Sequence, residues 1–201
     1  MQKTSYSDIL CHINDVPFAS KPTDQVFMGK LRDKMIQKKW DYLTERRFIE
    51  KITTGHAFYG CIFNGHDLME FAEGRQRQCW RAQSIVAVDI DKCPIHPRDM
   101  AKFYADLGLI PWIVYRTFSD NPYGPRSYRL MWRVEVDPRV TYEQWHTVIK
   151  SLAGLTEYGD KRAQDPSRMW QGTLNSLSWK IPGLMWSYED LTQILLSPQS
   201  V

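Results

Sequence analysis

The chain has 201 residues, 43% of them hydrophobic, which is enough for one sizeable core or for a core with a small additional unit. Its formal net charge of +3 permits an anionic partner without requiring one. The sequence shows no signal peptide and no long apolar stretch, which excludes a membrane-spanning protein. Its four cysteines form no CxxC pair, so we expect free thiols and a cytoplasmic location.

The first half of the chain gives weak structural signals. Residues 1–25 lack a clear period and are expected to form an irregular arm. Residues 26–54 have a helical pattern that is interrupted near Lys38, and residues 56–63 have the pattern of a strand. Residues 64–81 are polar and predict a long loop with one helical turn at residues 68–71. The basic and aromatic residues gathered here fit either nucleic-acid binding or a solvated helix face.

The second half has clearer periodicity. Residues 85–88 are apolar on both faces, which indicates a buried strand, and this strand ends at Asp89-Ile90-Asp91. A helix is expected from Pro97 to Gly108, followed by a strand over residues 111–115. Residues 127–136 alternate and predict a half-buried strand whose basic outer face carries Ser127, Arg129 and Arg133.

Two further helices complete the predicted elements. A capping box formed by Thr141 and Gln144 precedes a helix that runs to Gly154, and a last helix spans residues 188–196 after Ser187. The long loops and the half-buried strand favour an α+β fold over a doubly wound one, with helices packed mainly on one side of the sheet.

Asp89 and Asp91 form the most informative motif. Side chains two residues apart on a strand point the same way, so these carboxylates are expected to project together. At about 4 Å they would repel by roughly 4 kcal/mol at an effective dielectric constant near 20, which favours a shared proton or a divalent ion between them. Mg²⁺ or Mn²⁺ suits such oxygen ligands. The alternative is that both aspartates only begin the turn into the next helix.

Other side chains could complete a site for nucleotidyl transfer. A two-metal site needs a third acid, and Asp160, after Tyr158-Gly159, is the best placed in sequence. Ser127, Arg129 and Arg133 offer the donors that hold a triphosphate, or they are ordinary surface side chains. Cys93 and His96 have a spacing that suits zinc, but no second pair completes four ligands.

Over residues 60–172 the sequence resembles the archaeo-eukaryotic primase superfamily, in particular the primase-polymerase-like replication proteins of phages, plasmids and other mobile elements. The stretch from Ser84 to Asp91 is similar to the first motif of this family, a hydrophobic strand that ends in Asp-x-Asp and supplies metal ligands. The second motif, Ser-x-His, corresponds to Ser127-Tyr128-Arg129, so that arginine stands at the histidine position. Phosphate binding by Arg129 fits this departure, whereas a role in proton transfer does not.

The third motif of the family resembles the stretch from Gly159 to Gly172. This match implies that Asp160 is the third metal ligand and that Arg168 contacts the phosphate of a nucleotide or template. Asp165 is expected to cap a turn at Pro166, and the alternative for Arg168 is a surface ion pair with Asp165.

The resemblance implies a primase-polymerase catalytic fold, with an RRM-like sheet and an N-terminal αβ unit. Residues 1–80 would form the N-terminal unit, residues 81–185 the catalytic core and residues 186–201 a C-terminal helix. The implied activity is that of a DNA primase or DNA-directed polymerase, in replication of a mobile element or a host. It uses Mg²⁺ or Mn²⁺, NTPs or dNTPs and a single-stranded DNA template, with a separate helicase or single-strand-binding protein as a further partner. The sequence fits both a stand-alone enzyme and a fragment of a longer one.

Two alternatives remain open from the residues. A metal-dependent nuclease or phosphodiesterase would also use clustered aspartates, but with an activated water as the nucleophile. A catalytically inactive nucleic-acid-binding module would explain Arg129 as a sign of lost activity. A histidine-dependent nicking enzyme is excluded because the five histidines are isolated from one another.

Overall fold

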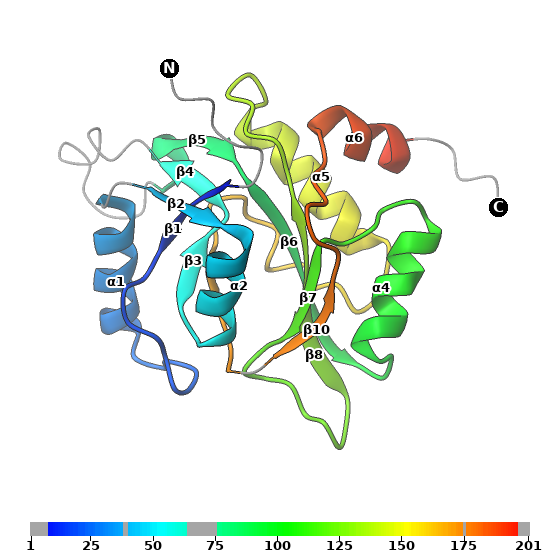
Figure 1. The fold of residues 1–201 in the computed structure, drawn as a ribbon, viewed down its shortest axis with the longest axis horizontal. Coiled ribbons are helices and arrows are strands. Elements are labelled where there is room, and N and C mark those ends of the chain that lie inside the picture. The colour runs from blue at the N-terminus through cyan, green and yellow to red at the C-terminus, as the bar shows by residue number, and fades with distance from the viewer. Residues whose placement is uncertain (1–7, 38–39, 64–75, 175, 197–201) are drawn as a thin grey trace.

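A computed structural model describes residues 8–37, 40–63, 76–174 and 176–196 of the chain (Figure 1). The elements follow in the order β1 (Asp8–Ile13), α1 (Gln25–Gln37), β2 (Asp41–Thr44), α2 (Glu45–Thr53), β3 (Ala57–Tyr59), β4 (Cys61–Phe63), α3 (Gln76–Cys79), β5 (Trp80–Gln83), β6 (Ile85–Cys93), α4 (Pro97–Asp106), β7 (Ile113–Arg116), β8 (Arg126–Arg133), α5 (Tyr142–Gly154), β9 (Met169–Gln171), β10 (Leu177–Lys180) and α6 (Tyr188–Leu196).

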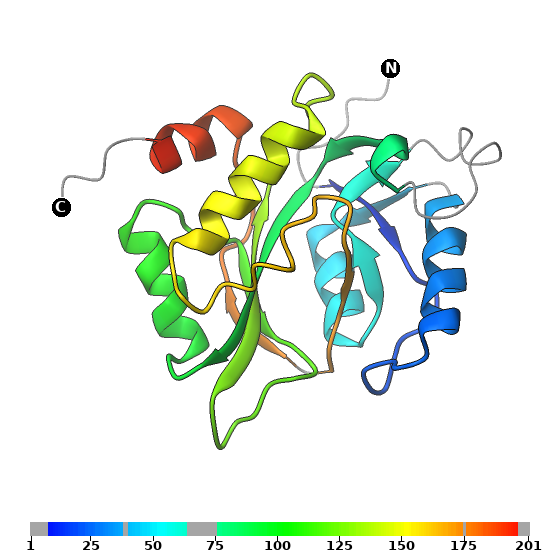
Figure 2. The same cartoon turned by 180° about the vertical axis from the view of Figure 1, so that it is seen from behind.

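The central sheet has the strand order β10-β7-β8-β6, and all of its neighbouring strands are antiparallel. Helices α4, α5 and α6 lie on one side of it (Figure 2). The apolar residues of α4 and α5, such as Tyr104, Trp145 and Leu152, pack with Val88 and Trp132 of the sheet into one core. The predicted α+β fold class, with helices mainly on one face of an RRM-like sheet, is therefore confirmed.

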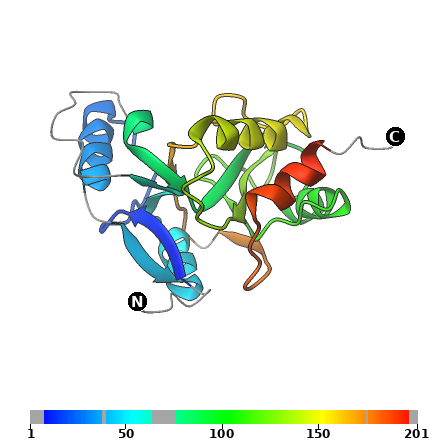
Figure 3. The same cartoon turned by 90° about the horizontal axis from the view of Figure 1, so that it is seen from above.

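The opposite face of the central sheet is covered by the N-terminal elements (Figure 3). These elements form a second sheet of order β2-β1-β3-β9, and its last strand comes from much later in the chain. A second apolar core forms between the two sheets, where Phe48 and Phe58 meet Trp112, Met131 and Trp170. The central sheet is thus buried on both faces.

This covering corrects the prediction for the strand over residues 127–136. The strand β8 ends at Arg133, and every residue from Ser127 to Arg133 is buried. Arg129 is 6% exposed and Arg133 is 4% exposed, so the predicted basic outer face does not face solvent. The prediction was wrong because an alternating pattern is also what a strand shows when its second face packs against polar groups of another unit.

Several local predictions were confirmed. Helix α4 begins with Pro97 after the N-cap His96, and α5 begins with the Thr141 and Gln144 capping box. Helix α6 follows Ser187, whose hydroxyl accepts a hydrogen bond from the backbone N–H of Asp190 at 3.0 Å. All four cysteines are free thiols, and all are buried.

The first half of the chain contains strands that its weak sequence patterns did not predict. The expected irregular arm contains β1, and the break near Lys38 is followed by β2 before α2 begins. The predicted loop ends in α3 and β5, while its expected helical turn at residues 68–71 lies outside the described residues. No helix in the part of the chain that the structure describes is long and apolar enough to cross a membrane.

Candidate functional site

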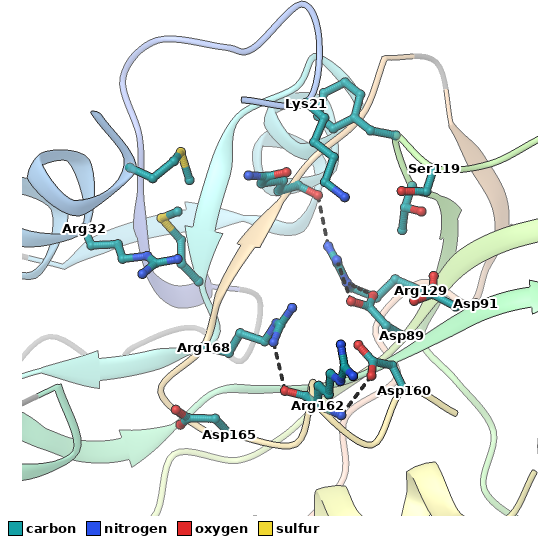
Figure 4. A pocket seen from close by; sticks show the side chains of 15 residues that line it. Lys21, Arg32, Asp89, Asp91, Ser119, Arg129, Asp160, Arg162, Asp165 and Arg168 are labelled. Atoms are coloured by element: carbon teal, nitrogen blue, oxygen red, sulfur yellow. Dashed lines mark hydrogen bonds and ion pairs between the residues drawn. The ribbon is translucent and has the colours of Figure 1, made fainter. Parts of the chain in front are cut away.

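A polar cavity of about 460 Å³ lies between the N-terminal elements and the central sheet (Figure 4). Cationic side chains line it from both sides, and the carboxylates come from β6 and the segment that begins at Asp160. Its lining residues are Lys21, Met28, Arg32, Asp89, Asp91, Thr117, Phe118, Ser119, Arg129, Asp160, Arg162, Asp165, Arg168, Met169 and Gln171. The three acids predicted from sequence therefore line one cavity, together with two of the four predicted nucleotide-binding residues.

Asp89 forms a two-pronged ion pair with Arg129 at the floor of this cavity. The two residues are direct cross-strand partners in the register of β6 with β8. Arg129 Nε donates to Asp89 Oδ1 at 2.6 Å, and Arg129 Nη2 donates to Asp89 Oδ2 at 3.2 Å. Both side chains are nearly excluded from solvent: that of Arg129 is 7% exposed and that of Asp89 is 11% exposed. Both oxygens of Asp89 are consequently engaged by a fixed cation.

The remaining contacts of Arg129 come from aromatic and backbone groups. Its Nη1 donates to the hydroxyl of Tyr115 and to the backbone oxygen of Gln171, the latter at 2.9 Å. Its guanidinium carbon lies 4.4 Å from the ring centroid of Trp170. Burial alone would lower the pKa of Arg129, but the neighbouring Asp89 and Tyr115 raise it overall, so the guanidinium stays charged. The Arg129 side chain, which belongs to β8, thus contacts residues of three other strands, β6, β7 and β9.

Asp91 lies at an irregularity of β6. The pairing of β6 with β8 shifts between Ile90 and Cys93, and Lys92 has a φ of 52°, which L residues seldom adopt. Asp91 is exposed to the cavity rather than buried in a pair. Its pKa is raised by burial first and then by the negative charges of Asp89 and Asp160, while a hydrogen bond with Ser127 acts in the opposite direction. A bound cation would relieve this repulsion.

Asp160 is positioned by a backbone bridge to β6. Gly159 pairs with Ile90, and the backbone N–H of Asp160 donates to the backbone oxygen of Asp89 at 2.8 Å. A Cβ atom at position 159 would collide with the backbone oxygen of Ala153, so the close approach of residue 159 to the end of α5 requires glycine. The carboxylate of Asp160 accepts a hydrogen bond from the backbone N–H of Arg162 at 2.8 Å. The chain thus brings Asp160 beside Asp89 in β6.

Some of the carboxylates in the cavity could hold a divalent ion. Carboxylate oxygens are the ligands that Mg²⁺ and Mn²⁺ prefer, and Asp91 and Asp160 present such oxygens. Asp89, however, is committed to Arg129. Among the described residues, no group of three or more Asp, Glu, His or Cys side chains is arranged to hold a metal ion. A metal would therefore need oxygens from a ligand in addition to Asp91 and Asp160.

Four further cations line the cavity. Arg168 Nη1 donates to the backbone oxygen of Arg162 at 3.0 Å, and its guanidinium carbon lies 5.4 Å from the centroid of Trp170. Arg162 and Lys21 were not predicted from sequence as site residues, whereas Arg32 belongs to the basic residues of the N-terminal half that were expected either to bind nucleic acid or to form a solvated helix face. Lys21 and Arg32 come from the N-terminal elements (Figure 4). The position of Arg162 two residues after Asp160 was the available signal, whereas nothing in the sequence linked Lys21 to the motifs.

Of three other residues discussed from the sequence, Arg133 and Ser127 do not line the cavity, whereas Asp165 does. Arg133 lies at the far end of β8, where its Nη2 donates to the backbone oxygen of Asp8 at 3.2 Å, and it does not line the cavity. Ser127 lies behind Asp91 and accepts a hydrogen bond from the backbone N–H of Lys92 at 3.4 Å. Asp165 caps the turn at Pro166, as expected, by accepting from the backbone N–H of Ser167 at 2.7 Å.

Comparisons with known proteins show a similarity of fold to a solved structure. No protein-family model matches the sequence, and no curated protein matches it. A solved structure, the AEP domain of the primase-polymerase (PrimPol) of cyanophage S-2L, is similar in fold with a TM-score of 0.51 and 14% sequence identity. The similarity covers 95% of this chain and 90% of that one. The chain accordingly has the fold of a primase-polymerase AEP domain, over nearly its whole length.

Proposed function

We propose that the chain is a nucleotidyltransferase of the archaeo-eukaryotic primase superfamily that joins NTPs or dNTPs along a single-stranded DNA template. The observation that carries the proposal is the convergence of Asp91 and Asp160 with Arg162 and Arg168 in one cavity of a primase-polymerase fold. Carboxylates for a metal and guanidinium groups for phosphates are what transfer of a nucleotidyl group requires.

The cationic side chains would bind the triphosphate. Arg162 and Arg168 come from the segment beside Asp160, and Lys21 and Arg32 approach from the other wall. Guanidinium groups match phosphate oxygens in geometry and would stabilise the charge that develops on the leaving pyrophosphate. In this proposal the nucleotide lies between the two walls, with its phosphates toward these four side chains.

Asp91 and Asp160 would hold Mg²⁺ or Mn²⁺ together with phosphate oxygens of the nucleotide. When bound, such an ion lowers the pKa of the attacking hydroxyl and neutralises charge on the triphosphate. Arg129 has a different role, because its donors are directed to Asp89, Tyr115 and Gln171. It neutralises Asp89 and fixes the floor of the cavity, so that the carboxylates around it keep their positions.

The test is a synthesis assay with the isosteric variant Asp91→Asn. Purified protein is incubated with single-stranded DNA templates, with and without a primer, labelled NTPs or dNTPs, and Mg²⁺ or Mn²⁺. We expect metal-dependent products from the wild type and a loss of at least about 100-fold in Asp91→Asn, the order of effect that follows removal of a charge-stabilising group. The matched control is Asp106→Asn, at an exposed acid in the last turn of α4, which should retain activity.

Asp91 is preferred to Asp89 for this test because Asp89→Asn would leave the buried guanidinium of Arg129 without its counter-ion. Products formed in the absence of a primer would indicate a primase, whereas products formed only when a primer is present would indicate a polymerase. Equal synthesis by wild type and Asp91→Asn would exclude the assigned role of this carboxylate.

The Asp89 and Arg129 pair also favours a second candidate function, that of a nucleotide- or nucleic-acid-binding module without catalysis. The pair occupies one of the three acids that the family motifs assign to metal. In this case the protein would bind nucleoside triphosphates or DNA, but no product would form with either metal. The same assay, combined with a measurement of nucleotide binding, separates the two functions.

A further inference from the structure

A second cavity, of about 370 Å³, lies at the end of the central sheet away from Arg133. It is formed where the N-terminus of α4 meets the ends of β7, β8 and β10 (Figure 1). Its lining residues are His96, Arg98, Arg116, Pro122, Arg126, Leu177 and Ser178. None of these residues of the described chain carries a carboxylate, so the wall is cationic.

The acid Asp120 offsets part of this charge. It accepts hydrogen bonds from Arg126 Nε at 2.8 Å and from Arg126 Nη2 at 3.0 Å, and it lies 3.9 Å from Arg116 Nη1. Arg98 Nε donates to the backbone oxygen of Ser178 at 3.3 Å, and Arg98 is exposed. Three arginines against this one carboxylate leave net positive charge, which is the electrostatic requirement for binding a phosphate backbone.

The connection between β7 and β8 contributes residues to this cavity and to the candidate nucleotide site. Thr117, Phe118 and Ser119 line the first cavity, whereas Pro122 and Arg126 line the second. The two cavities are therefore neighbours that share one short segment of the chain.

The same connection presents an aromatic ring to solvent. Tyr123 is 98% exposed, the highest value among the exposed large hydrophobic residues of the described chain. The segment is ordered by backbone hydrogen bonds from Thr117 N to Ser127 O at 3.0 Å and from Gly124 N to Asn121 O at 3.2 Å. A single exposed aromatic is common. Beside a cationic cavity it has the arrangement of single-strand binding sites, in which bases stack on rings and phosphates contact arginines.

We propose that this cavity and Tyr123, together called the basic groove, bind single-stranded nucleic acid next to the nucleotide site. Arg98 and Arg116 contact the phosphates, while Arg126, paired with Asp120, adds positive charge to the wall, and the ring of Tyr123 stacks on an unpaired base. The assignment rests on the proposed function for the role of the strand as template or primer. Binding itself is independent of synthesis, and it can be measured without nucleotide or metal.

The test measures binding of a labelled oligothymidine by fluorescence anisotropy, without nucleotide or divalent ion. Tyr123→Ala should weaken the affinity by about 5- to 100-fold, because the ring on which one base stacks is removed. Arg98→Glu should also weaken binding, and it should reduce the slope of log affinity against log salt by about one for each phosphate that the variant no longer binds. Tyr123→Phe keeps the ring and should bind as the wild type does.

Two matched controls use exposed residues away from the groove. Tyr42→Ala removes an aromatic side chain from β2 that is 53% exposed, and Lys150→Glu reverses a charge on α5. Both should leave the affinity unchanged. Unchanged affinity in Tyr123→Ala and Arg98→Glu would overturn the proposal. So would an equal weakening in the controls, which would indicate a diffuse charge effect.

A further arm uses inorganic phosphate as a competitor. If phosphate binding depends on Arg98 while oligothymidine binding does not depend on Tyr123, the groove is an anion site and the nucleic-acid assignment fails. The outcome is separable from the synthesis assay: Asp91→Asn should bind oligothymidine normally even where it makes no product. Intact binding without any synthesis by the wild-type protein would therefore count against the proposed function alone.

Discussion

Arg129 and Asp89 illustrate at the scale of single residues how a buried charge pair constrains a site. The guanidinium contacts Asp89, Tyr115, Trp170 and the backbone of Gln171, which come from three different strands. Burial of two charges is costly, and the cost is offset only while both partners and their hydrogen bonds are present. The position of the Asp89 carboxylate therefore depends on this one arginine.

Replacing Arg129 by methionine should destabilise the protein strongly. Arg129→Met leaves Asp89 buried without a counter-ion, and the expected loss in the free energy of unfolding is about 3–5 kcal/mol. Urea denaturation followed by circular dichroism measures it. The double variant Arg129→Met/Asp89→Leu removes both charges and should recover part of the loss. A double variant less stable than Arg129→Met would show that the unpaired charge is not the cause.

The exposed pair of Arg139 and Asp137 provides the matched control. Arg139 Nη2 lies 2.7 Å from Asp137 Oδ2, a geometry close to that of the buried pair, but the arginine side chain is 86% exposed. Solvent screens such a pair, so Arg139→Met should leave the denaturation midpoint almost unchanged. Similar losses at the two sites would show that burial does not set the energetics of these pairs.

At the scale of elements, the connection between β7 and β8 depends on Asp120. Its side chain is only 6% exposed and accepts hydrogen bonds from Arg126 and from the backbone N–H of Ser127. Burial alone would raise the pKa of Asp120, but these hydrogen bonds lower it overall. A carboxyl with a lowered pKa in the folded state stabilises the protein above its unfolded pKa of about 3.9. This contribution is lost as the pH falls through the lower folded value.

Asp120→Asn should accordingly cost about 1.5–3 kcal/mol of unfolding free energy at pH 7, the range for hydrogen bonds to a charged group. The difference between variant and wild type should shrink as the pH is lowered below about 4, because Asp120 of the unfolded wild-type chain then binds a proton, and it should vanish once the pH falls below the lower pKa of the folded state. Denaturation midpoints over this pH range test the sign. A difference that stays constant with pH would mean that the carboxylate charge contributes nothing.

The elements that sequence predicted best are those with local determinants. Helices α4 and α5 begin at a proline and at a capping box, and each signal lies close to the helix start. The strand that carries Asp89 and Asp91 was predicted from an apolar run, but it continues to Cys93 and does not end at Asp91. The pairing of Asp89 with Arg129 was not predicted, because it depends on the register between β6 and β8. The two residues are 40 positions apart in the sequence. The covering of β8 by the N-terminal elements is equally non-local.

At the scale of the whole molecule, the candidate site lies between the N-terminal elements and the central sheet. Lys21, Met28 and Arg32 belong to the N-terminal elements, while Asp89, Asp91 and Asp160 belong to the central sheet and the segment beside it. A ligand that contacts both walls links their stabilities, because it binds only when both are in place. Local opening of α1 would then remove part of the site.

Binding of a non-hydrolysable nucleoside triphosphate should therefore slow hydrogen exchange in α1 (Gln25–Gln37). At a free ligand concentration tenfold above the dissociation constant, the expected protection is about 1.4 kcal/mol, or roughly tenfold in the exchange rate. Helix α6 (Tyr188–Leu196), which contributes no residue to the cavity, should be unaffected. Arg32→Ala should abolish the effect, whereas Lys34→Ala, an exposed residue of the same helix that does not line the cavity, should preserve it. Protection confined to β6 and β8 would place the nucleotide on the central sheet alone and would remove Lys21 and Arg32 from the site.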